Sequence, residues 1–178
     1  LEHIVRNVHV LEHLAHAGKH RRKVFQVAHL LDLLDLADEV HKVFEFFEAW
    51  AEEKAVALRF VGSHCRVIGD PLMLRRAISN LLSNAIRYTP AGQAVTIQLS
   101  ENAGKIRLVV ENPGTPIAAE HLPRLFDRFY RVDPSRQRKG EGSGIGLAIV
   151  KSIVGAHHGS VAAQSDLRST RFIVVLPK

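Results

Sequence analysis

Four glycines in alternate positions constrain this chain more than any other feature. They are Gly140, Gly142, Gly144 and Gly146. An apolar helical pattern begins directly after them. Glycine lets a ligand approach the main chain closely, and the free N–H groups of a helix N-terminus favour an anion such as phosphate. The pattern predicts a mobile loop that closes over an anion, although a flexible linker before an ordinary helix would have the same composition.

The spacing of these glycines excludes the two common nucleotide motifs. It is not the G-x-x-x-x-G-K-[ST] of a P-loop. No glycine follows three residues after Gly142 or Gly144, as a Rossmann fingerprint requires. A nucleotide site built on this stretch therefore belongs to neither class.

Length and composition are those of a soluble globular protein. The chain has 178 residues, of which 46% are hydrophobic and 24% are charged, enough for one well-buried domain and an appendage. No apolar run approaches the roughly 18 to 20 residues of a membrane span. The single cysteine, Cys65, excludes an internal disulfide. Because the first residue is Leu1, we expect the sequence to be a piece of a longer protein.

The formal net charge of +6 is modest, and much of the excess lies just before the glycines. The residues concerned are Arg124, Arg128, Arg131, Arg136, Arg138 and Lys139. A compact cluster of this kind suits a polyphosphate better than a nucleic-acid backbone, which requires a longer basic stripe. We therefore expect no nucleic-acid partner.

The N-terminal part predicts an amphipathic helix over residues 1–18, and residues 24–30 predict a short strand. This N-terminal segment carries four histidines whose spacing of four, three and four would place them on one helical side, His9, His13, His16 and His20. Histidines four residues apart can share a metal ion. Because no carboxylate or cysteine joins them, a solvated or partly packed face is the favoured interpretation.

The remaining elements follow from periodicity and from turn residues. Asp35 is predicted to cap a helix that runs to about Lys54. A short helix is expected around residues 119–125. Strands are expected at 56–61 and 65–68 around a polar turn at 62–64, at 94–99 and 105–111 as a hairpin, and at about 160–164 and 170–176.

A strongly indicated helix follows Asp70, which caps it, and Pro71, which occupies its first turn. Its side opposite the apolar stripe carries Asn80 and Asn84, with Arg76 and Arg87 beside them. Asparagine is a poor helix former, so two of them on one face suggest a function. Their amide oxygens suit Mg²⁺, which needs only one or two protein oxygens when it arrives with nucleotide phosphates. The alternative is a pair of tolerated surface asparagines.

The order of these pieces over about residues 34–178 resembles the ATP-binding catalytic domain of bacterial sensor histidine kinases, of the Bergerat ATPase superfamily. Asn80-Leu-Leu-Ser-Asn84-Ala-Ile-Arg87-Tyr88 is similar to the family's N box. Phe126-Asp-Arg-Phe129-Tyr130-Arg131 is similar to its F box, and Gly140-Glu-Gly-Ser-Gly-Ile-Gly146-Leu to its second glycine box. The sequence around these motifs is most similar to heavy-metal (copper/silver) sensor kinases.

The resemblance implies a fold and a set of ligand contacts. The fold is a two-layer α/β sandwich, a mixed sheet with three main helices on one face, here preceded by an N-terminal helix. Asn80 and Asn84 are implied to hold Mg²⁺ and the ATP phosphates, Arg87 to touch phosphate, and Tyr88 to lie beside the adenine. The further implied nucleotide contacts are Asn112, Gly114, Ile117, Phe126, Phe129, Tyr130, Arg138, Lys139, Gly140, Gly142, Ser143, Gly144, Ile145, Gly146, Leu147 and Thr170.

The chain departs from the family pattern at several positions. Asn112 stands where most relatives have the aspartate that accepts a hydrogen bond from the adenine amino group, and a neutral acceptor makes a weaker bond. Pro116 replaces the second glycine of that motif, and Ser169 replaces the glycine before Thr170. Arg76 occupies a position that is often Gln or Glu, so no catalytic base is assigned.

The family's phosphoacceptor histidine box is missing from this sequence. Residues 1–22 correspond in position to the end of a dimerisation helix or a linker, and residues 23–178 to the ATP-binding domain. The resemblance implies that the domain donates the ATP γ-phosphoryl group to a histidine of its own dimerisation domain, in a homodimer that serves a cognate response regulator. It also implies a cytoplasmic domain of an inner-membrane protein, itself soluble. The alternatives are a regulatory nucleotide-binding module without catalysis and a Bergerat-type ATPase.

Overall fold

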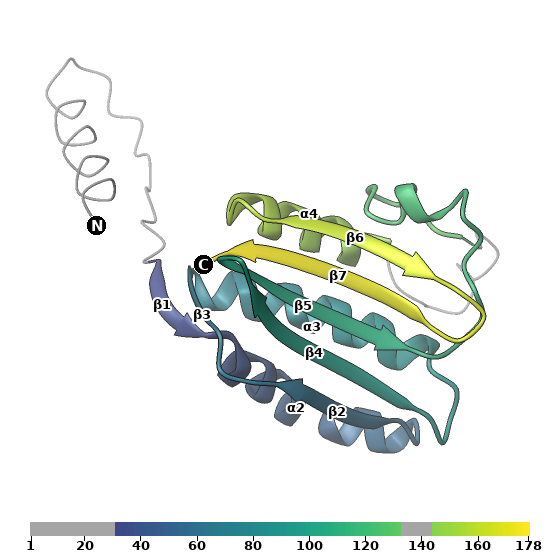
Figure 1. Ribbon diagram of the computed structural model, residues 1–178. Helices are drawn as coiled ribbons and strands as arrows, with labels where there is room; N and C mark the ends of the chain where they lie inside the picture. The colour runs from purple at the N-terminus through teal and green to yellow at the C-terminus, as the bar shows by residue number, and fades with distance from the viewer. Residues whose placement is uncertain (1–30, 133–143) are drawn as a thin grey trace, which may run out of the picture.

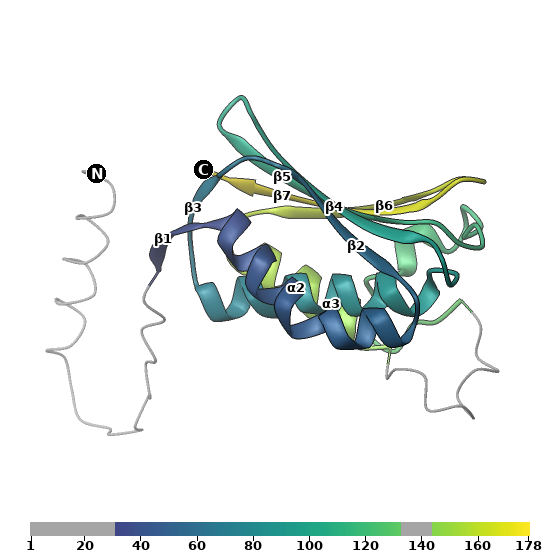
Figure 2. The ribbon, with the colours of Figure 1, turned by 90° about the horizontal axis from the view of Figure 1, so that it is seen from below.

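The computed structural model describes residues 31–132 and 144–178. A five-stranded mixed sheet has the order β2 (Ala57–Gly62), β4 (Ala94–Asn102), β5 (Lys105–Asn112), β7 (Thr170–Pro177) and β6 (Ser160–Ser165). Only the β2–β4 pair is parallel within this sheet. Helices α2 (Leu36–Glu53), α3 (Pro71–Tyr88) and α4 (Gly146–Ala156) all cover one face, as Figures 1 and 2 show. The predicted two-layer sandwich is confirmed.

The core lies between the sheet and the three helices. It is formed by apolar residues that alternate along the strands and recur every three or four positions along the helices. In β5 the alternate residues Ile106, Leu108 and Val110 are buried toward the helices. In α3 the buried residues recur every three or four positions: Leu74, Ala77, Ile78, Leu81, Leu82, Ala85 and Ile86. Side chains spaced this way share one helix face, so α3 lies on the sheet along its whole length.

Both predicted helix caps are confirmed. The Asp35 carboxylate accepts a hydrogen bond from the Ala37 N–H at 3.0 Å. Asp70 accepts from Leu72 N–H at 2.8 Å and from Met73 N–H at 3.0 Å. These bonds satisfy main-chain donors that a helix start otherwise leaves without partners. Within the described ranges, no helix is both long and apolar enough to cross a membrane.

The strands on either side of the polar turn at 62–64 form as predicted, but they do not pair with each other. β3 (Arg66–Gly69) leaves the main sheet and pairs antiparallel with β1 (Asp32–Asp35) in a separate ribbon. Leu34 and Val67 are buried on the inner side of this ribbon, so it closes one end of the core. The strand predicted at 24–30 lies outside the described residues, as does the helix predicted at 1–18.

The helix predicted around residues 119–125 is wrong. Only a single 3₁₀ turn forms there, at Leu122–Arg124. Its hydrogen bonds link residues three apart, from Arg124 N–H to His121 O at 3.0 Å and from Leu125 N–H to Leu122 O at 3.4 Å. Pro123 has no N–H and disfavours the α conformation of the residue before it, which explains why no longer helix develops.

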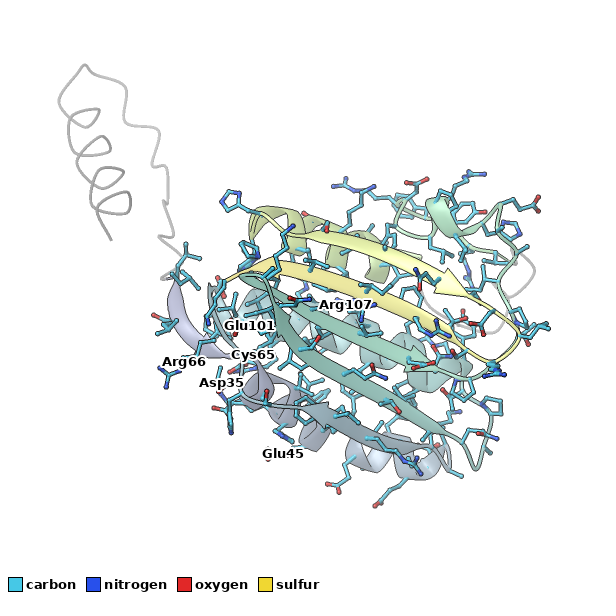
Figure 3. The ribbon with its side chains drawn as sticks, in the orientation of Figure 1. Asp35, Glu45, Cys65, Arg66, Glu101 and Arg107 are labelled. Carbon is cyan, nitrogen blue, oxygen red and sulfur yellow. The ribbon has the colours of Figure 1, made fainter. Side chains whose placement is uncertain are left out.

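The ribbon end of the molecule, shown in Figure 3, contains Asp35 and Cys65. His64 Nδ1 lies 2.7 Å from Asp35 Oδ2, so the histidine beside the cysteine pairs with the helix cap. Cys65 is buried. Burial raises the pKa of its thiol, and the charges of Glu101 and Asp35 act in the same direction. His64 thus has a local partner in Asp35 and Cys65 is part of the core, which agrees with the interpretation of His64 as a turn residue.

His157 joins the end of α4 to the start of α3. Its buried ring accepts the Asp70 N–H at Nε2 over 3.0 Å, and its Nδ1 donates to Ile153 O over 2.8 Å. Because a main-chain N–H can only donate, Nε2 carries no proton, and the ring is the neutral tautomer protonated at Nδ1. This contact fixes the C-terminal end of α4 against the helix that carries the asparagines.

A buried ion pair joins α2 to α3. Glu39 is only 3% exposed. Its carboxylate accepts from Arg75 Nε at 2.8 Å and from Lys42 Nζ at 2.7 Å. Burial acts to raise the pKa of this carboxyl, but the hydrogen bonds and charges of Arg75 and Lys42 outweigh it. The pKa of Glu39 therefore lies below its ordinary value of 4.5.

We predict that this pair contributes to acid sensitivity. A carboxyl with a lowered folded-state pKa gives its full stabilisation above its unfolded pKa, and this is lost as the pH falls through the folded value. Glu39→Gln should lower the free energy of unfolding at pH 7 by about 1–3 kcal/mol, and the loss should shrink below pH 4.5. Urea unfolding from pH 3 to 7 measures this. Glu48→Gln, an exposed change on the same helix, is the control. A loss in Glu39→Gln that is constant with pH would contradict the prediction.

Candidate functional site

The residues singled out from the sequence converge at one end of the sandwich, opposite the β1–β3 ribbon. This end holds the C-terminus of α3, the turn after β5, the β6–β7 turn and the N-terminus of α4 (Figure 1). The elements meet here because β5 and α3 run toward this end, whereas β7 and α4 start from it. The site thus combines the C-terminal ends of α3 and β5 with the N-terminal ends of α4 and β7.

Asn80 lies against the first residue of α4. Its Nδ2 donates to Arg76 O at 2.9 Å, so Oδ1 is its remaining polar atom. A Cβ placed on Gly146 would lie 3.1 Å from Asn80 Oδ1. Glycine at 146 thus allows the start of α4 to approach the asparagine face closely. Asn80 and Asn84 are both half-buried rather than freely solvated.

At the N-terminus of α4, the described N-cap residue provides no side-chain cap. Ile145 occupies the N-cap position and makes no side-chain cap hydrogen bond. The first N–H groups of an α-helix have no partners within the helix, and its dipole favours negative charge there. The first main-chain N–H groups of α4, which suit an anion, therefore lie beside Asn80 Oδ1, an oxygen of the kind that suits Mg²⁺. This arrangement fits a phosphate group accompanied by a divalent cation.

Asn112 provides a buried polar group at the end of β5. The residue is 3% exposed, and its Nδ2 donates to Pro113 O at 3.0 Å. Among the described residues, nothing donates a hydrogen bond to its Oδ1. Buried acceptors normally have partners, so the oxygen is available to a donor such as the exocyclic amino group of adenine. Asn112, which replaces the usual aspartate, therefore still has an oxygen that can accept a hydrogen bond.

Gly114 brings the turn after β5 onto the end of α3. A Cβ added to Gly114 would lie 2.8 Å from the Tyr88 carbonyl oxygen, too close for any side chain. Tyr88 itself is exposed at the end of α3. This close approach holds the turn after Asn112 against the main chain of the last residue of α3.

The turn ends at Ile117, whose N–H donates to Ser165 Oγ in β6 at 2.9 Å. Ser165 Oγ lies 2.8 Å from Thr170 Oγ1. Thr170 pairs in register with Asn112 across β5 and β7. The two implied base-contacting side chains are therefore neighbours on adjacent strands.

Ser169 has a specific role at its position. Its hydroxyl donates to Glu111 Oε1 at 2.5 Å, and Arg171 Nε donates to the same oxygen at 3.1 Å. Asp166 accepts from the N–H groups of Arg168 and Ser169 at 2.8 and 3.0 Å and closes the β6–β7 turn. These backbone hydrogen bonds lower the pKa of Asp166, and the charge of Arg171 adds to the effect. The serine that replaces the usual glycine therefore stabilises this turn through a side-chain bond.

The aromatic segment divides into buried and exposed parts. Phe126 is buried and meets Phe172 edge to face at 6.3 Å. Tyr130 is half-buried, with its hydroxyl 2.7 Å from His121 Nδ1 and Arg124 lying 4.3 Å from its ring centroid. Phe129 is 72% exposed and has a φ of +64°, a conformation that is unusual for an aromatic residue and concentrates at functional sites.

Phe129 also joins the two sides of residues 130–143. Its N–H donates to Gly144 O at 2.9 Å. Gly144 has a φ of +69°, and an added Cβ there would lie 3.1 Å from the Phe129 main chain. Glycine is therefore required at 144 for both conformation and space.

The remaining predicted residues are placed only in part. Arg87 is exposed near the end of α3, and Ile145 and Leu147 are half-buried at the start of α4. Arg138, Lys139, Gly140, Gly142 and Ser143 lie outside the described residues.

Sequence reasoning missed Ser165 and His121. Ser165 could have been found from the register of the last hairpin, because a turn over 166–169 places it opposite Thr170. His121 carries no such signal, since its contact with Tyr130 depends on the irregular path between them.

Comparison with known proteins shows the class to which this arrangement belongs. Residues 69–178 match the family model of histidine kinase-, DNA gyrase B- and HSP90-like ATPases, and the chain belongs to this family. Sensor histidine kinase CusS of Escherichia coli (strain K12) is 70% identical over 132 residues, which are 74% of this chain and 28% of CusS. The chain thus spans little more than a quarter of that relative.

Solved structures agree with this assignment. The mycobacterial sensor histidine kinase MprB superposes with a TM-score of 0.73 at 28% identity, covering 83% of this chain and 97% of that chain. Full-length ShkA in complex with AMPPNP superposes with a TM-score of 0.72 at 25% identity, covering 98% of this chain and 36% of that chain. The sequence and fold are those of the catalytic ATPase domain of sensor histidine kinases, and the resemblance inferred from the sequence motifs is confirmed.

We predict that Gly114→Ala destabilises the protein, because the new methyl group meets a main-chain carbonyl 2.8 Å away that cannot rotate aside. The expected loss in the free energy of unfolding is about 1–3 kcal/mol, measured by chemical denaturation. Gly155→Ala, in α4 with nothing within 4 Å of the added Cβ, is the matched control and should raise stability by about 0.5–1 kcal/mol. Equal behaviour of the two variants would contradict the inferred close approach.

Proposed function

We propose that this domain binds Mg-ATP and donates the γ-phosphoryl group to a histidine on the dimerisation domain of its full-length protein. The observation that carries the proposal is the juxtaposition of Asn80 Oδ1 with the N-terminus of α4, whose N-cap residue Ile145 provides no side-chain cap. One side supplies a hard oxygen for Mg²⁺, and the other supplies main-chain donors for phosphate oxygens. Family membership and the AMPPNP complex of the structural neighbour ShkA support the same ligand.

The residues of the site divide the work between the two ends of the nucleotide. Asn80 and Asn84 hold the cation, and the first N–H groups of α4 hold phosphate. Asn112 Oδ1 accepts from the adenine amino group, and Thr170 lies beside it. Arg87, Arg138 and Lys139 neutralise charge on the phosphates, while Tyr88 flanks the base. Mg²⁺ adds neutralisation of the transferring group, and phosphoryl transfer requires mainly such positioning and charge stabilisation.

The wider assignment rests on similarity to sensor kinases. We propose that the full-length protein is a homodimeric, membrane-bound kinase that responds to a heavy metal, with this part in the cytoplasm. Its phosphate is passed to an aspartate of a cognate response regulator. A regulatory module without catalysis is less well supported, because Ser169 and Asn112 both have structural or acceptor roles in this site.

We predict that Asn80→Ala weakens Mg-dependent nucleotide binding. Loss of an oxygen that contacts the cation should reduce the affinity for AMPPNP by about tenfold or more in the presence of Mg²⁺, and by much less in its absence. Isothermal titration with and without the metal measures both. Asn102→Ala, the same change at the exposed end of β4, is the control. Unaltered Mg-AMPPNP affinity in Asn80→Ala and Asn84→Ala would return these residues to the surface interpretation.

A second prediction concerns phosphotransfer. With γ-labelled ATP, this chain alone should remain unlabelled, because the acceptor box is missing from it. Addition of the dimerisation domain of the full-length protein should produce an acid-labile phosphohistidine on that domain. Nucleotide binding without any transfer would contradict the kinase assignment and favour the regulatory alternative. Stable label on this chain would instead contradict the expectation that it contains no acceptor.

A further inference from the structure

We propose that Ser165 is a positioning residue for the base end of the site, and that it supports selection of a 6-amino purine over a 6-oxo purine. The proposal rests on the nucleotide-binding function proposed above. It concerns a residue on β6 that belongs to none of the recognised motifs.

Three polar side chains form a row across three neighbouring strands. Ser165 pairs in register with Thr170, and Thr170 pairs with Asn112. All three occupy the helix-covered side of the sheet, where Asn112 and Thr170 are 3% and 5% exposed. Few polar side chains are buried on this side, so the row marks a polar end to an otherwise apolar layer.

The Ser165 hydroxyl is the branch point of this row. Its oxygen accepts the Ile117 N–H at 2.9 Å and lies 2.8 Å from Thr170 Oγ1. A serine hydroxyl has one hydrogen and two lone pairs. After it accepts from Ile117, its own hydrogen can still reach Thr170, and Thr170 is then able to donate toward a ligand. One side chain therefore fixes both the end of the turn and the orientation of the threonine.

The turn between Asn112 and Ile117 is held at three places. Asn112 Nδ2 donates to Pro113 O, Gly114 lies against the Tyr88 carbonyl, and Ile117 is bonded to Ser165. The first contact leaves Oδ1 as the Asn112 atom available to a base. Of these three contacts, only the last is made by a side-chain hydroxyl, so Ser165→Ala removes it by deleting a single oxygen atom.

The chemistry of this row defines the base that it recognises. Adenine carries an amino donor at position 6 and an acceptor at N1, which match an Asn112 acceptor and a Thr170 donor. Hypoxanthine carries an oxygen at position 6 and a proton at N1, so both pairings are reversed. A site with fixed hydrogen-bond polarity discriminates strongly against a ligand that leaves its groups unpaired. Because Ser165 maintains this polarity, its loss reduces the discrimination as well as the affinity.

The test measures ADP and IDP binding by isothermal titration in MgCl₂ for the whole chain and its variants. Ser165→Ala should weaken ADP by about three- to tenfold and IDP by less, so that the ADP/IDP affinity ratio falls. Ser165→Thr keeps the hydroxyl and should restore most of the ratio. Ser160→Ala, the same change at an exposed position on the same strand, should match the wild type.

The outcomes separate this inference from the function on which it rests. Equal weakening of ADP and IDP by Ser165→Ala, or no change in either, overturns the positioning role while leaving nucleotide binding intact. A wild-type chain that binds neither nucleotide overturns the proposed function and this inference together. If Ser165→Ala does not fold, Ser165→Cys replaces it, because a thiol has similar size but forms much weaker hydrogen bonds.

Discussion

The packing of α4 along α3 is the contact on which the site depends. At one end His157 accepts the Asp70 N–H and holds the end of α4 to the start of α3. At the other end Gly146 meets Asn80 with no side chain between them. Because both ends are held, the N-terminus of α4 has a defined position relative to the asparagine face. An anion site made of main-chain groups requires this precision, since backbone donors cannot adjust as side chains do.

Much of this architecture could be predicted from the sequence because it depends on local chemistry. Asp35 and Asp70 cap helices, and alternating apolar residues form the β4–β5 hairpin. The partners of β2 and β3 could not be predicted from the local sequence. Two strands on either side of a short turn favour pairing with each other, whereas here β2 pairs with β4 and β3 pairs with β1. The helix expected near residue 120 does not extend beyond a single 3₁₀ turn, because Pro123 disfavours the α conformation. The convergence of Asn80, Asn112 and Thr170 followed from resemblance, since the distances among α3, β5 and β7 are set by packing.

The departures from the family pattern become physically reasonable in the folded chain. Asn112 retains an available acceptor because its amide nitrogen is used by the Pro113 carbonyl. Ser169 replaces a glycine without any strained backbone angle, and its hydroxyl joins the Glu111–Arg171 pair. Pro116 likewise occupies a position with no left-handed angle. Asn112 and Ser169 are therefore held by side-chain hydrogen bonds to neighbouring residues, and Pro116 fits its position without a left-handed angle.

The hydrogen bond from Phe129 to Gly144 has a consequence for how this protein can vary. It brings into contact the two residues that flank residues 130–143, so the chain between them is closed at that contact. The entropic cost of closing a chain segment at its ends grows only with the logarithm of its length. Added residues between Phe129 and Gly144 therefore cost little free energy of folding. A substitution at either of these two residues, in contrast, weakens the contact that joins the ends of the segment. A change in the length of this stretch is therefore expected to leave the sheet and its helices in place, while it displaces the phosphate contacts proposed at Arg138 and Lys139.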